Sequence, residues 1–311
     1  MPQNPYLFVV GCPRSGTTLL QRILDHHPQL AVSNDTHFIP GAIKRAGDGT
    51  DPPLTTELVE WVLGYRTFSR LGLPEATVRA AAAEARTCSE FVSALYRAFG
   101  RKHGKPLAGA KDPRYVRYLP LLHALFPWVK TIHIIRDGRD VALSTLEWAR
   151  EDKGPGRFAL WREEPVAVCA LWWRWHVSTG RQDGADLGPF RYREVKYEDL
   201  VARPEEAVGD ITSFLELPFA PEMLTYHEGK TRLEPGLSSK KAWLPPTPGL
   251  RDWRTQMSER DVALFEAIAG DLLSDLGYKQ AINTIPPEIV EMAERCQGWW
   301  DLEMARRQGK R

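Results

Sequence analysis

The chain has 311 residues, of which 43% are hydrophobic and 26% are charged, and its formal net charge is +1. These values are ordinary for a globular protein with one large core, and the balanced charge excludes the basic excess typical of nucleic-acid-binding proteins. No apolar run approaches the ~20 residues of a membrane-spanning helix, so we expect neither a nucleic-acid partner nor a membrane span.

The cysteines and the first residues bear on the cellular compartment. Cys12, Cys88, Cys169 and Cys296 are scattered, with no CxxC pair, which favours reduced thiols over a disulfide framework or a zinc site. Met1–Tyr6 shows no basic segment followed by a long apolar stretch, so we expect no signal peptide. The sequence therefore predicts a cytoplasmic protein.

The chain begins with a predicted strand, a glycine-bounded loop and a helix. Leu7–Val10 is a short apolar run typical of a strand buried on both faces, and Thr17–Leu24 carries apolar residues at helical spacing. The loop between them, Gly11–Gly16, has the layout of a phosphate cradle, in which N–H groups and a helix N-terminus face an anion. The alternative is an ordinary tight turn between strand and helix, which would not need the arginine and the paired threonines. The nucleotide-binding pattern G-x-x-x-x-G-K-[ST] has a lysine where this chain has Thr17, and here the loop cation is Arg14. Because that lysine contacts the hydrolysed phosphates beside Mg²⁺, its replacement suits a nucleotide with a shorter 5′ tail and no obligatory metal.

A second short strand and a helical block follow. Residues 30–32 are predicted as a strand, and the next loop brings Asp35 and His37 to the expected mouth of the sheet. Residues 44–53, which are rich in Gly, Asp and Pro, are predicted as a connection, and residues 55–100 as helical. Further strands are predicted at 107–110, 131–135 and 190–195, loops at 186–189 and 235–249, and helices at 119–126, 165–179, 204–215, 258–276 and 289–307.

Strands that alternate with helices predict the fold class. The pattern indicates an α/β protein with a parallel sheet and right-handed crossovers, in which ligands bind beyond the carboxyl ends of the strands. We expect a P-loop-type three-layer fold with a central parallel β-sheet flanked by helices. We also expect one domain over residues 1–311, with a helical insert at about 55–100 and an extra C-terminal helix at about 286–311.

A second candidate site follows the strand at 131–135. Arg136 comes directly after this strand, and Ser144 lies about two helical turns further on. An arginine and a serine placed in this way can share one phosphate through charge-assisted hydrogen bonds. Taken alone, Arg136 would more simply form a surface salt bridge to Asp137 or Asp140.

These motifs resemble one enzyme family. Pro13-Arg-Ser-Gly-Thr-Thr18 resembles the 5′-phosphosulfate loop of sulfotransferases that use 3′-phosphoadenosine-5′-phosphosulfate (PAPS), and is most similar to the branch of the tyrosylprotein sulfotransferases and many bacterial sulfotransferase-like proteins. Arg136 and Ser144 match that family's 3′-phosphate site, where a serine follows a strand-end arginine eight positions later. The resemblance, which runs from Tyr6 to about Tyr278, implies transfer of a sulfuryl group from PAPS to a hydroxyl or amine acceptor, with release of 3′,5′-adenosine bisphosphate (PAP) and no metal.

The resemblance also implies roles for individual residues. It implies that the 5′ end of the nucleotide is bound by Arg14, Ser15, Gly16, Thr17 and Thr18, and the 3′-phosphate by Arg136 and Ser144. Lys111 resembles the lysine that contacts the transferring sulfuryl group, although on its own it would be expected to pair with Asp112. Tyr197 matches a position near the nucleotide, although a bare tyrosine is more often part of the core. Arg251 and Arg254 lie in a stretch that resembles the late loop over the adenosine and the 3′-phosphate.

The general base is open at the sequence level. The histidine that cytosolic sulfotransferases carry soon after the lysine is absent, because Asp112 and Pro113 occupy those positions. The tyrosylprotein branch uses a glutamate before a Thr-x-Ile-Pro-like sequence, and Asp35 stands in that place. A carboxylate can take the acceptor proton if burial raises its pKa. We therefore predict Asp35 as the base, with His37, Asp112 and a purely structural role for Asp35 as alternatives.

Two other functions remain as alternatives to a sulfotransferase. A kinase or NTPase of the same loop superfamily would need the missing lysine and a metal-binding acid. A non-catalytic nucleotide-binding protein would not need both phosphate sites. The sequence leaves open the oligomeric state and the acceptor, for which a small molecule or a conjugate with a hydroxyl group is expected.

Overall fold

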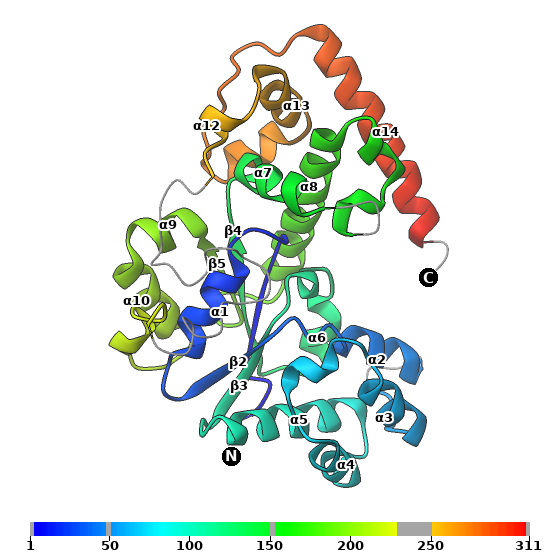
Figure 1. Ribbon diagram of the computed structural model, residues 1–311, viewed down its shortest axis with the longest axis vertical. Helices are drawn as coiled ribbons and strands as arrows, with labels where there is room; N and C mark the ends of the chain where they lie inside the picture. The colour runs from blue at the N-terminus through cyan, green and yellow to red at the C-terminus, as the bar shows by residue number, and fades with distance from the viewer. Residues whose placement is uncertain (1–2, 48–50, 150–152, 229–250, 309–311) are drawn as a thin grey trace. The chain divides into compact units, whose positions relative to one another are not determined.

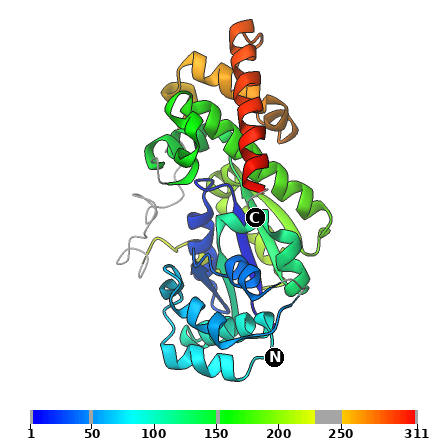
Figure 2. The same ribbon diagram turned by 90° about the vertical axis from the view of Figure 1, so that its right-hand side faces the viewer.

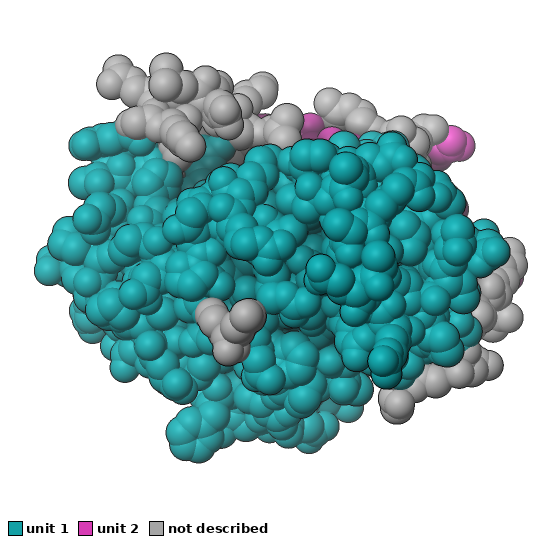
Figure 3. All heavy atoms as spheres, turned by 90° about the horizontal axis from the view of Figure 1, so that it is seen from below, with its two compact units in different colours: residues 1–11, 16–135, 180–248 teal, residues 12–15, 136–179, 249–311 magenta. Residues whose placement is uncertain are grey.

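The structure is a computed structural model that describes residues 3–47, 51–149, 153–228 and 251–308. Its residues form two compact units, which are coloured separately in Figure 3. Unit 1 comprises residues 1–11, 16–135 and 180–248, and unit 2 comprises residues 12–15, 136–179 and 249–311. Compact units are not in themselves domain boundaries, so the single domain stays a prediction.

Unit 1 is built on a parallel sheet of five strands in the order β2-β3-β1-β4-β5. The strands are β1 (Leu7–Gly11), β2 (Leu30–Asn34), β3 (Leu107–Lys111), β4 (Lys130–Ile135) and β5 (Tyr192–Lys196). β1 lies at the centre, and its Val9 is in register with Lys111 of β3 and with Ile132 of β4. The α/β fold class with a central parallel sheet is confirmed.

Helices of unit 1 cover both faces of this sheet (Figure 1). They are α1 (Thr17–Asp25), α2 (Ile39–Ala46), α3 (Thr56–Leu63), α4 (Glu75–Ala83), α5 (Cys88–Lys102), α6 (Leu119–Leu125), α9 (Tyr197–Ala202) and α10 (Pro204–Phe214), with 3₁₀ helices at Phe68–Leu71, Pro113–Arg117 and Pro221–Met223. Phe8 and Val10 of β1 pack in a core with residues of α2, α3, α5 and α6, whereas Leu7 and Val9 pack with residues of α1 and α10. Because strand side chains alternate between faces, an unbroken apolar run was the correct signal for a strand covered on both sides.

The start of the segment predicted as a connection is helical in unit 1. The connection predicted at 44–53 is wrong at its start, because α2 continues to Ala46. Ile39, Ala42 and Ile43 are buried at helical spacing, and this packing outweighs the local turn signal. Residues 48–50 and 229–250 lie outside the described residues, and with them lies the loop predicted at 235–249.

Unit 2 is helical in its described part. It contains α7 (Gly138–Trp148), α8 (Pro165–Ala185), α12 (Trp253–Gln256), α13 (Glu259–Asp275) and α14 (Pro287–Gln308), with 3₁₀ helices at Gly154–Arg157 and Ala159–Arg162. Only the part of α8 up to Thr179 belongs to unit 2, and the rest belongs to unit 1. The predicted C-terminal helix runs beside α13 (Figures 1 and 2), and its Trp300 stacks on Phe158 with ring centroids 4.6 Å apart. Among the described residues, no helix has the length and apolar character needed to cross a membrane.

Two buried histidines of unit 1 should make the fold sensitive to acid. His123 and His133 are 4% and 0% exposed, and each ring hydrogen-bonds a hydroxyl group. Burial, assisted by the charge of Arg191, lowers the pKa of His123 to about 4. Burial, assisted by the charge of Arg181, lowers the pKa of His133 to about 3. Both rings are therefore neutral in the folded protein at pH values where they are protonated in the unfolded chain.

We predict that this difference makes the free energy of unfolding fall as the pH falls below about 6.5, because the unfolded chain then binds protons that the folded protein does not. Each histidine contributes up to about 1.4 kcal/mol per pH unit. Urea unfolding at about pH 7.5 and about pH 5 measures this change. The free energy of unfolding should fall less between these two pH values in His123→Gln than in the wild type. The exposed His103 supplies the control His103→Gln, and an equal loss in all three proteins would contradict the prediction.

Candidate functional site

In unit 2, the phosphate-loop motif contributes a tight turn. The N–H of Ser15 donates to the carbonyl of Cys12 at 3.1 Å, and Pro13 and Arg14 occupy the two central positions. Arg14 has φ 79°, a left-handed conformation that such turns normally reserve for glycine and that costs of order 1–3 kcal/mol. Its Nε donates to Oγ of Ser144 at 3.0 Å. The two sequence motifs are thus joined by a direct hydrogen bond.

Three arginines of unit 2 bring positive charge to the same place. Burial, followed by repulsion from Arg251 and Arg136 and opposed by Glu147, lowers the pKa of Arg14. Arg136 is only 7% exposed and forms an ion pair with Asp140 at 3.3 Å. Arg251 forms an ion pair with Glu147. An anion bound between guanidinium groups that repel one another would offset this repulsion and form charge-assisted hydrogen bonds with them.

The Ser15 hydroxyl adds a second sign of an anion site. Ser15 is 0% exposed, and within the described residues its Oγ has no hydrogen-bond partner. Buried polar atoms are rarely left unsatisfied in proteins. A phosphate or sulfate oxygen is the kind of partner that this hydroxyl and the neighbouring Arg14 would share, so the residues of unit 2 fit a phosphorylated ligand.

In unit 1, the N-terminus of α1 is prepared for the same kind of ligand. Gly16 has φ 96°, and a Cβ at this position would lie 2.4 Å from a ring carbon of Tyr197. α1 begins at Thr17 with no side-chain cap and no acidic residue in its first turn. The helix dipole favours an anion at such an N-terminus, where no acidic side chain of the helix competes with it. Tyr197 is partly buried and packs against the core that contains Leu7 and Val9 of β1. Its ring therefore supports the loop at Gly16 from the side of this core.

Lys111 ends β3 as a fully buried cation of unit 1. Its side chain is 1% exposed, and its Nζ lies 2.8 Å from Oδ1 of Asp35 and 3.4 Å from Oγ1 of Thr18. Burial lowers the pKa of Lys111, and the charges of Asp35 and Asp112 oppose this shift. The expected pairing of an isolated strand-edge lysine with Asp112 is wrong, because the register of the sheet turns Lys111 toward Asp35. The N–H of Asp35 donates to the carbonyl of Lys111 at 2.8 Å, which holds the two residues side by side.

The other two candidate bases form a separate pair. Nδ1 of His37 lies 2.5 Å from Oδ2 of Asp112, whose side chain is 0% exposed. Nε of Arg114 donates toward the same His37 nitrogen at 3.2 Å. With a proton on Nδ1, His37 donates to Asp112; without it, His37 accepts from Arg114. Both Asp35 (φ 37°) and His37 (φ 59°) have left-handed backbones, which is the kind of strain that gathers at functional sites.

Asp35, His37 and Asp112 also have the donor atoms of a metal site. One atom from each lies within 4.8 Å of the others. Two cations already face these atoms, however, since the Lys111 ammonium pairs with Asp35 and the Arg114 guanidinium lies beside His37. Their positive charge opposes a divalent ion, and the absence of a metal stays a prediction.

Several contacts of the site were not visible in the sequence. Arg70 donates to the carbonyl of Asp35 at 3.0 Å, and the Arg14 guanidinium lies 6.0 Å from the ring of Trp148. Neither Arg70 nor Trp148 belongs to a motif, so no sequence signal marks them. Arg254 is 66% exposed, pairs with Asp252 at 3.6 Å and stacks on Trp253. Its contact with the nucleotide therefore stays a prediction that no contact of the structure supports.

Comparison with known proteins gives a consistent result. The family described as "Sulfotransferase family" matches residues 5–221. The chain is 27% identical to a protein-tyrosine sulfotransferase of Drosophila melanogaster over 73% of its length, but it spans only 41% of that protein. It is 26% identical to protein-tyrosine sulfotransferase A of Caenorhabditis elegans, over 91% of this chain and 69% of that protein. Among solved structures, the sulfotransferase domain of the Synechococcus PCC 7002 olefin synthase shares the fold, with a TM-score of 0.56, 22% identity and 94% coverage of each chain.

The pair of Lys111 and Asp35 leads to a prediction about stability. Asp35→Asn removes a carboxylate from a buried ammonium and should lower the free energy of unfolding by about 3 kcal/mol near pH 7. The deficit should shrink as the pH rises, because the already lowered pKa of Lys111 falls further in the variant and the folded protein then releases the proton before the unfolded chain does.

Urea unfolding of the wild type, Asp35→Asn, Lys111→Met and the double variant measures this effect. Lys111→Met introduced into the Asp35→Asn protein should recover most of the lost stability, because it removes the unpaired charge. Additive losses in the double variant would contradict the prediction.

Proposed function

The chain belongs to the sulfotransferase family, and we propose that it transfers the sulfuryl group of PAPS to a hydroxyl or amine acceptor and releases PAP. The observation that carries this proposal is the hydrogen bond between Arg14 and Ser144. It joins the 5′-loop motif to the 3′-phosphate motif within one set of arginines. A nucleotide that carries anions at both its 5′ and 3′ ends uses both motifs, whereas a nucleotide without the 3′-phosphate uses one.

We assign the nucleotide contacts residue by residue. Arg14, Ser15, Gly16, Thr17 and Thr18 bind the 5′-phosphosulfate, through the Arg14 guanidinium, the unsatisfied Ser15 hydroxyl and the uncapped start of α1. Arg136 and Ser144 bind the 3′-phosphate. Tyr197, Arg251 and Arg254 lie at the nucleotide as well, with Arg251 supported by its effect on the pKa of Arg14.

The chemical step follows from the charges that these residues carry. The acceptor oxygen attacks sulfur in line with the bridging oxygen of the 5′-phosphate, the S–O bond breaks, and PAP leaves with the bonding electrons. Arg14 and Lys111 place positive charge where the equatorial and bridging oxygens become more negative. Asp35 takes the proton of the acceptor. Its distance of 2.8 Å from the Lys111 Nζ supports this role, because the proposed base and the proposed cation lie side by side.

The acceptor is proposed only as a class. Relatives of this chain are named protein-tyrosine sulfotransferases, and a phenolic hydroxyl is one member of the class. We propose a hydroxyl or amine group on a small molecule or a conjugate, with no nucleic-acid partner, no metal and a cytoplasmic location.

The proposal predicts selective binding and turnover. PAP should bind at least about tenfold more tightly than AMP, because a 3′-phosphate adds charge-assisted hydrogen bonds worth about 1.5–3 kcal/mol. Calorimetric titration with PAP and AMP measures the ratio. Incubation with sulfur-labelled PAPS and a panel of phenols, sugars, lipids and peptides, without added Mg²⁺, should release PAP and label at least one acceptor. Equal affinity for PAP and AMP, with no labelled acceptor, would contradict the proposed function.

The assignment of the base predicts different effects for two neighbouring residues. Asp35→Asn should lower kcat by roughly 10²–10⁴ with the affinity for PAP intact, and His37→Asn should cost much less. Because Asp35 also pairs with Lys111, acceptors of different hydroxyl acidity separate its two roles. The loss in Asp35→Asn should be largest for the least acidic hydroxyl, which needs a base most. A loss that is the same for all acceptors, or a larger loss in His37→Asn, would show that Asp35 is not the base.

A further inference from the structure

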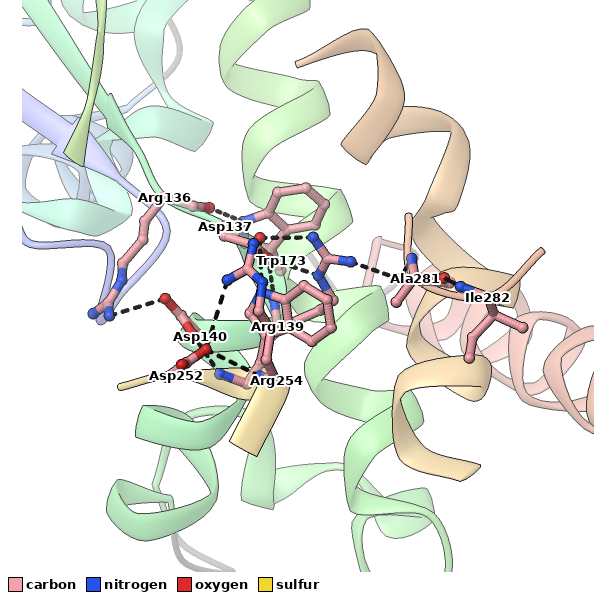
Figure 4. A network of polar contacts seen from close by, with 11 residues as sticks. Arg136, Asp137, Arg139, Asp140, Trp173, Asp252, Arg254, Ala281 and Ile282 are labelled. Atoms are coloured by element: carbon pink, nitrogen blue, oxygen red, sulfur yellow. Dashed lines mark hydrogen bonds and ion pairs between the residues drawn. The ribbon is translucent and has the colours of Figure 1, made fainter. Parts of the chain in front are cut away.

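Asp140 of α7 is shared between two partners in unit 2. Its Oδ2 accepts from the Arg136 guanidinium at 3.3 Å (Figure 4). Its Oδ1 accepts from the backbone N–H of Trp253, the first residue of α12, at 3.0 Å. One carboxylate therefore connects the arginine assigned to the 3′-phosphate with the segment that carries Arg251.

The Trp253 side chain is held as firmly as its backbone. It is 5% exposed, and its Nε1 donates to Oδ2 of Asp137 at 3.1 Å. The guanidinium of Arg139 lies over the indole ring, 3.7 Å from the centroid, a distance typical of a desolvated cation–π contact. Trp253 thus fills a position at the start of α7, where Asp137 is also the N-cap residue.

Arg139 extends this network into the C-terminal part of unit 2. It is 1% exposed and pairs with Asp137 at 2.7 Å and with the fully buried Glu266 at 2.6 Å. Glu266 also accepts from the backbone N–H groups of Ala281 and Ile282 at 2.9 and 3.0 Å (Figure 4). Buried ion pairs of this kind are costly to break but contribute little to net stability, which leaves positioning as their clearest contribution.

Asp140 is an unexpected group to find beside a phosphate site. Its negative charge repels a phosphate bound to Arg136, and burial raises its pKa against the opposing effect of Arg136. A carboxylate is nevertheless the one side chain of this size that can accept from two donors at two oxygens, whereas an asparagine has one acceptor oxygen. The bridge between Arg136 and Trp253 accounts for a carboxylate at this position.

We propose that Asp140 and Trp253 are positioning residues that determine the selectivity for a 3′-phosphorylated nucleotide, by holding the Arg136 guanidinium and the segment Arg251–Gln256 in one fixed arrangement. The inference rests on the proposed function, because it assumes that Arg136 binds the 3′-phosphate. Arg251 precedes Trp253 by two residues and pairs with Glu147 of α7, so the same anchoring of Trp253 also holds Arg251 against α7.

The test compares the affinities for PAP and AMP in Trp253→Phe and Asp140→Asn. Trp253→Phe keeps an aromatic side chain but loses the indole N–H and its hydrogen bond to Asp137. Asp140→Asn has one acceptor oxygen in place of two and can satisfy only one of the two donors. In each variant the affinity for PAP should fall about fivefold to tenfold, and the affinity for AMP should change less than about twofold. The KM for PAPS should rise with kcat at saturation nearly unchanged. The double variant should be no worse than the more affected single variant, because both act through one bridge.

The control is Trp300→Phe, which alters another buried tryptophan of unit 2 that packs on Phe158 outside this network. It should lose a similar amount of thermal stability and keep the ratio of PAP to AMP affinity. Asp140→Asn that binds PAP more tightly would show that the carboxylate acts by repulsion alone and would overturn the inference. An unchanged ratio in Trp253→Phe would overturn it too. If the wild type itself does not distinguish PAP from AMP, the proposed function fails and the inference fails with it.

Discussion

The structure depends on the pairing of buried cations with carboxylates. Lys111, Arg136 and Arg139 are each less than 10% exposed, and each has an acidic partner, at 2.8 Å, 3.3 Å and 2.7 Å respectively. An unpaired charge in such surroundings would be destabilised by several kcal/mol. The carboxylates therefore make it possible to keep positive charge out of water at fixed positions. Fixed charge of this kind needs little reorganisation when an anionic transition state forms.

Asp35 and Asp112, two acidic residues of unit 1, have different partners. Asp35 faces the Lys111 ammonium, and Asp112 faces the imidazole of His37. Asp35 is thus held beside a buried cation, 2.8 Å from its Nζ. His37, held by a fully buried carboxylate, has its ring orientation set by Asp112. The two candidate bases of this loop, Asp35 and His37, therefore have different charged partners.

Backbone strain accompanies these contacts. Arg14, Asp35 and His37 all have left-handed φ values, although none of them is glycine. Such conformations persist only where the surroundings hold them, and here each of the three residues has side-chain or backbone contacts that do so: Arg14 with Ser144, Asp35 with Lys111 and His37 with Asp112. Strain at these three positions places the functional groups where an ordinary turn would not.

The parallel sheet, the glycine-bounded loop after β1 and the residues at the strand ends could be predicted from the sequence, because short apolar runs and glycine-bounded turns are local signals. The turn signal at residues 44–46 misled, because the packing of α2 outweighs it. The sequence also predicted functional roles for Arg14, Lys111, Arg136 and Ser144, and these stay predictions. The partners of the charged side chains came from the three-dimensional structure alone. Lys111 pairs with Asp35 rather than with its neighbour Asp112, Arg251 pairs with Glu147 across 104 positions, and Arg139 pairs with Glu266 across 127 positions. Such pairings depend on strand register and helix packing, and the spacing of residues along the chain carries no information about them.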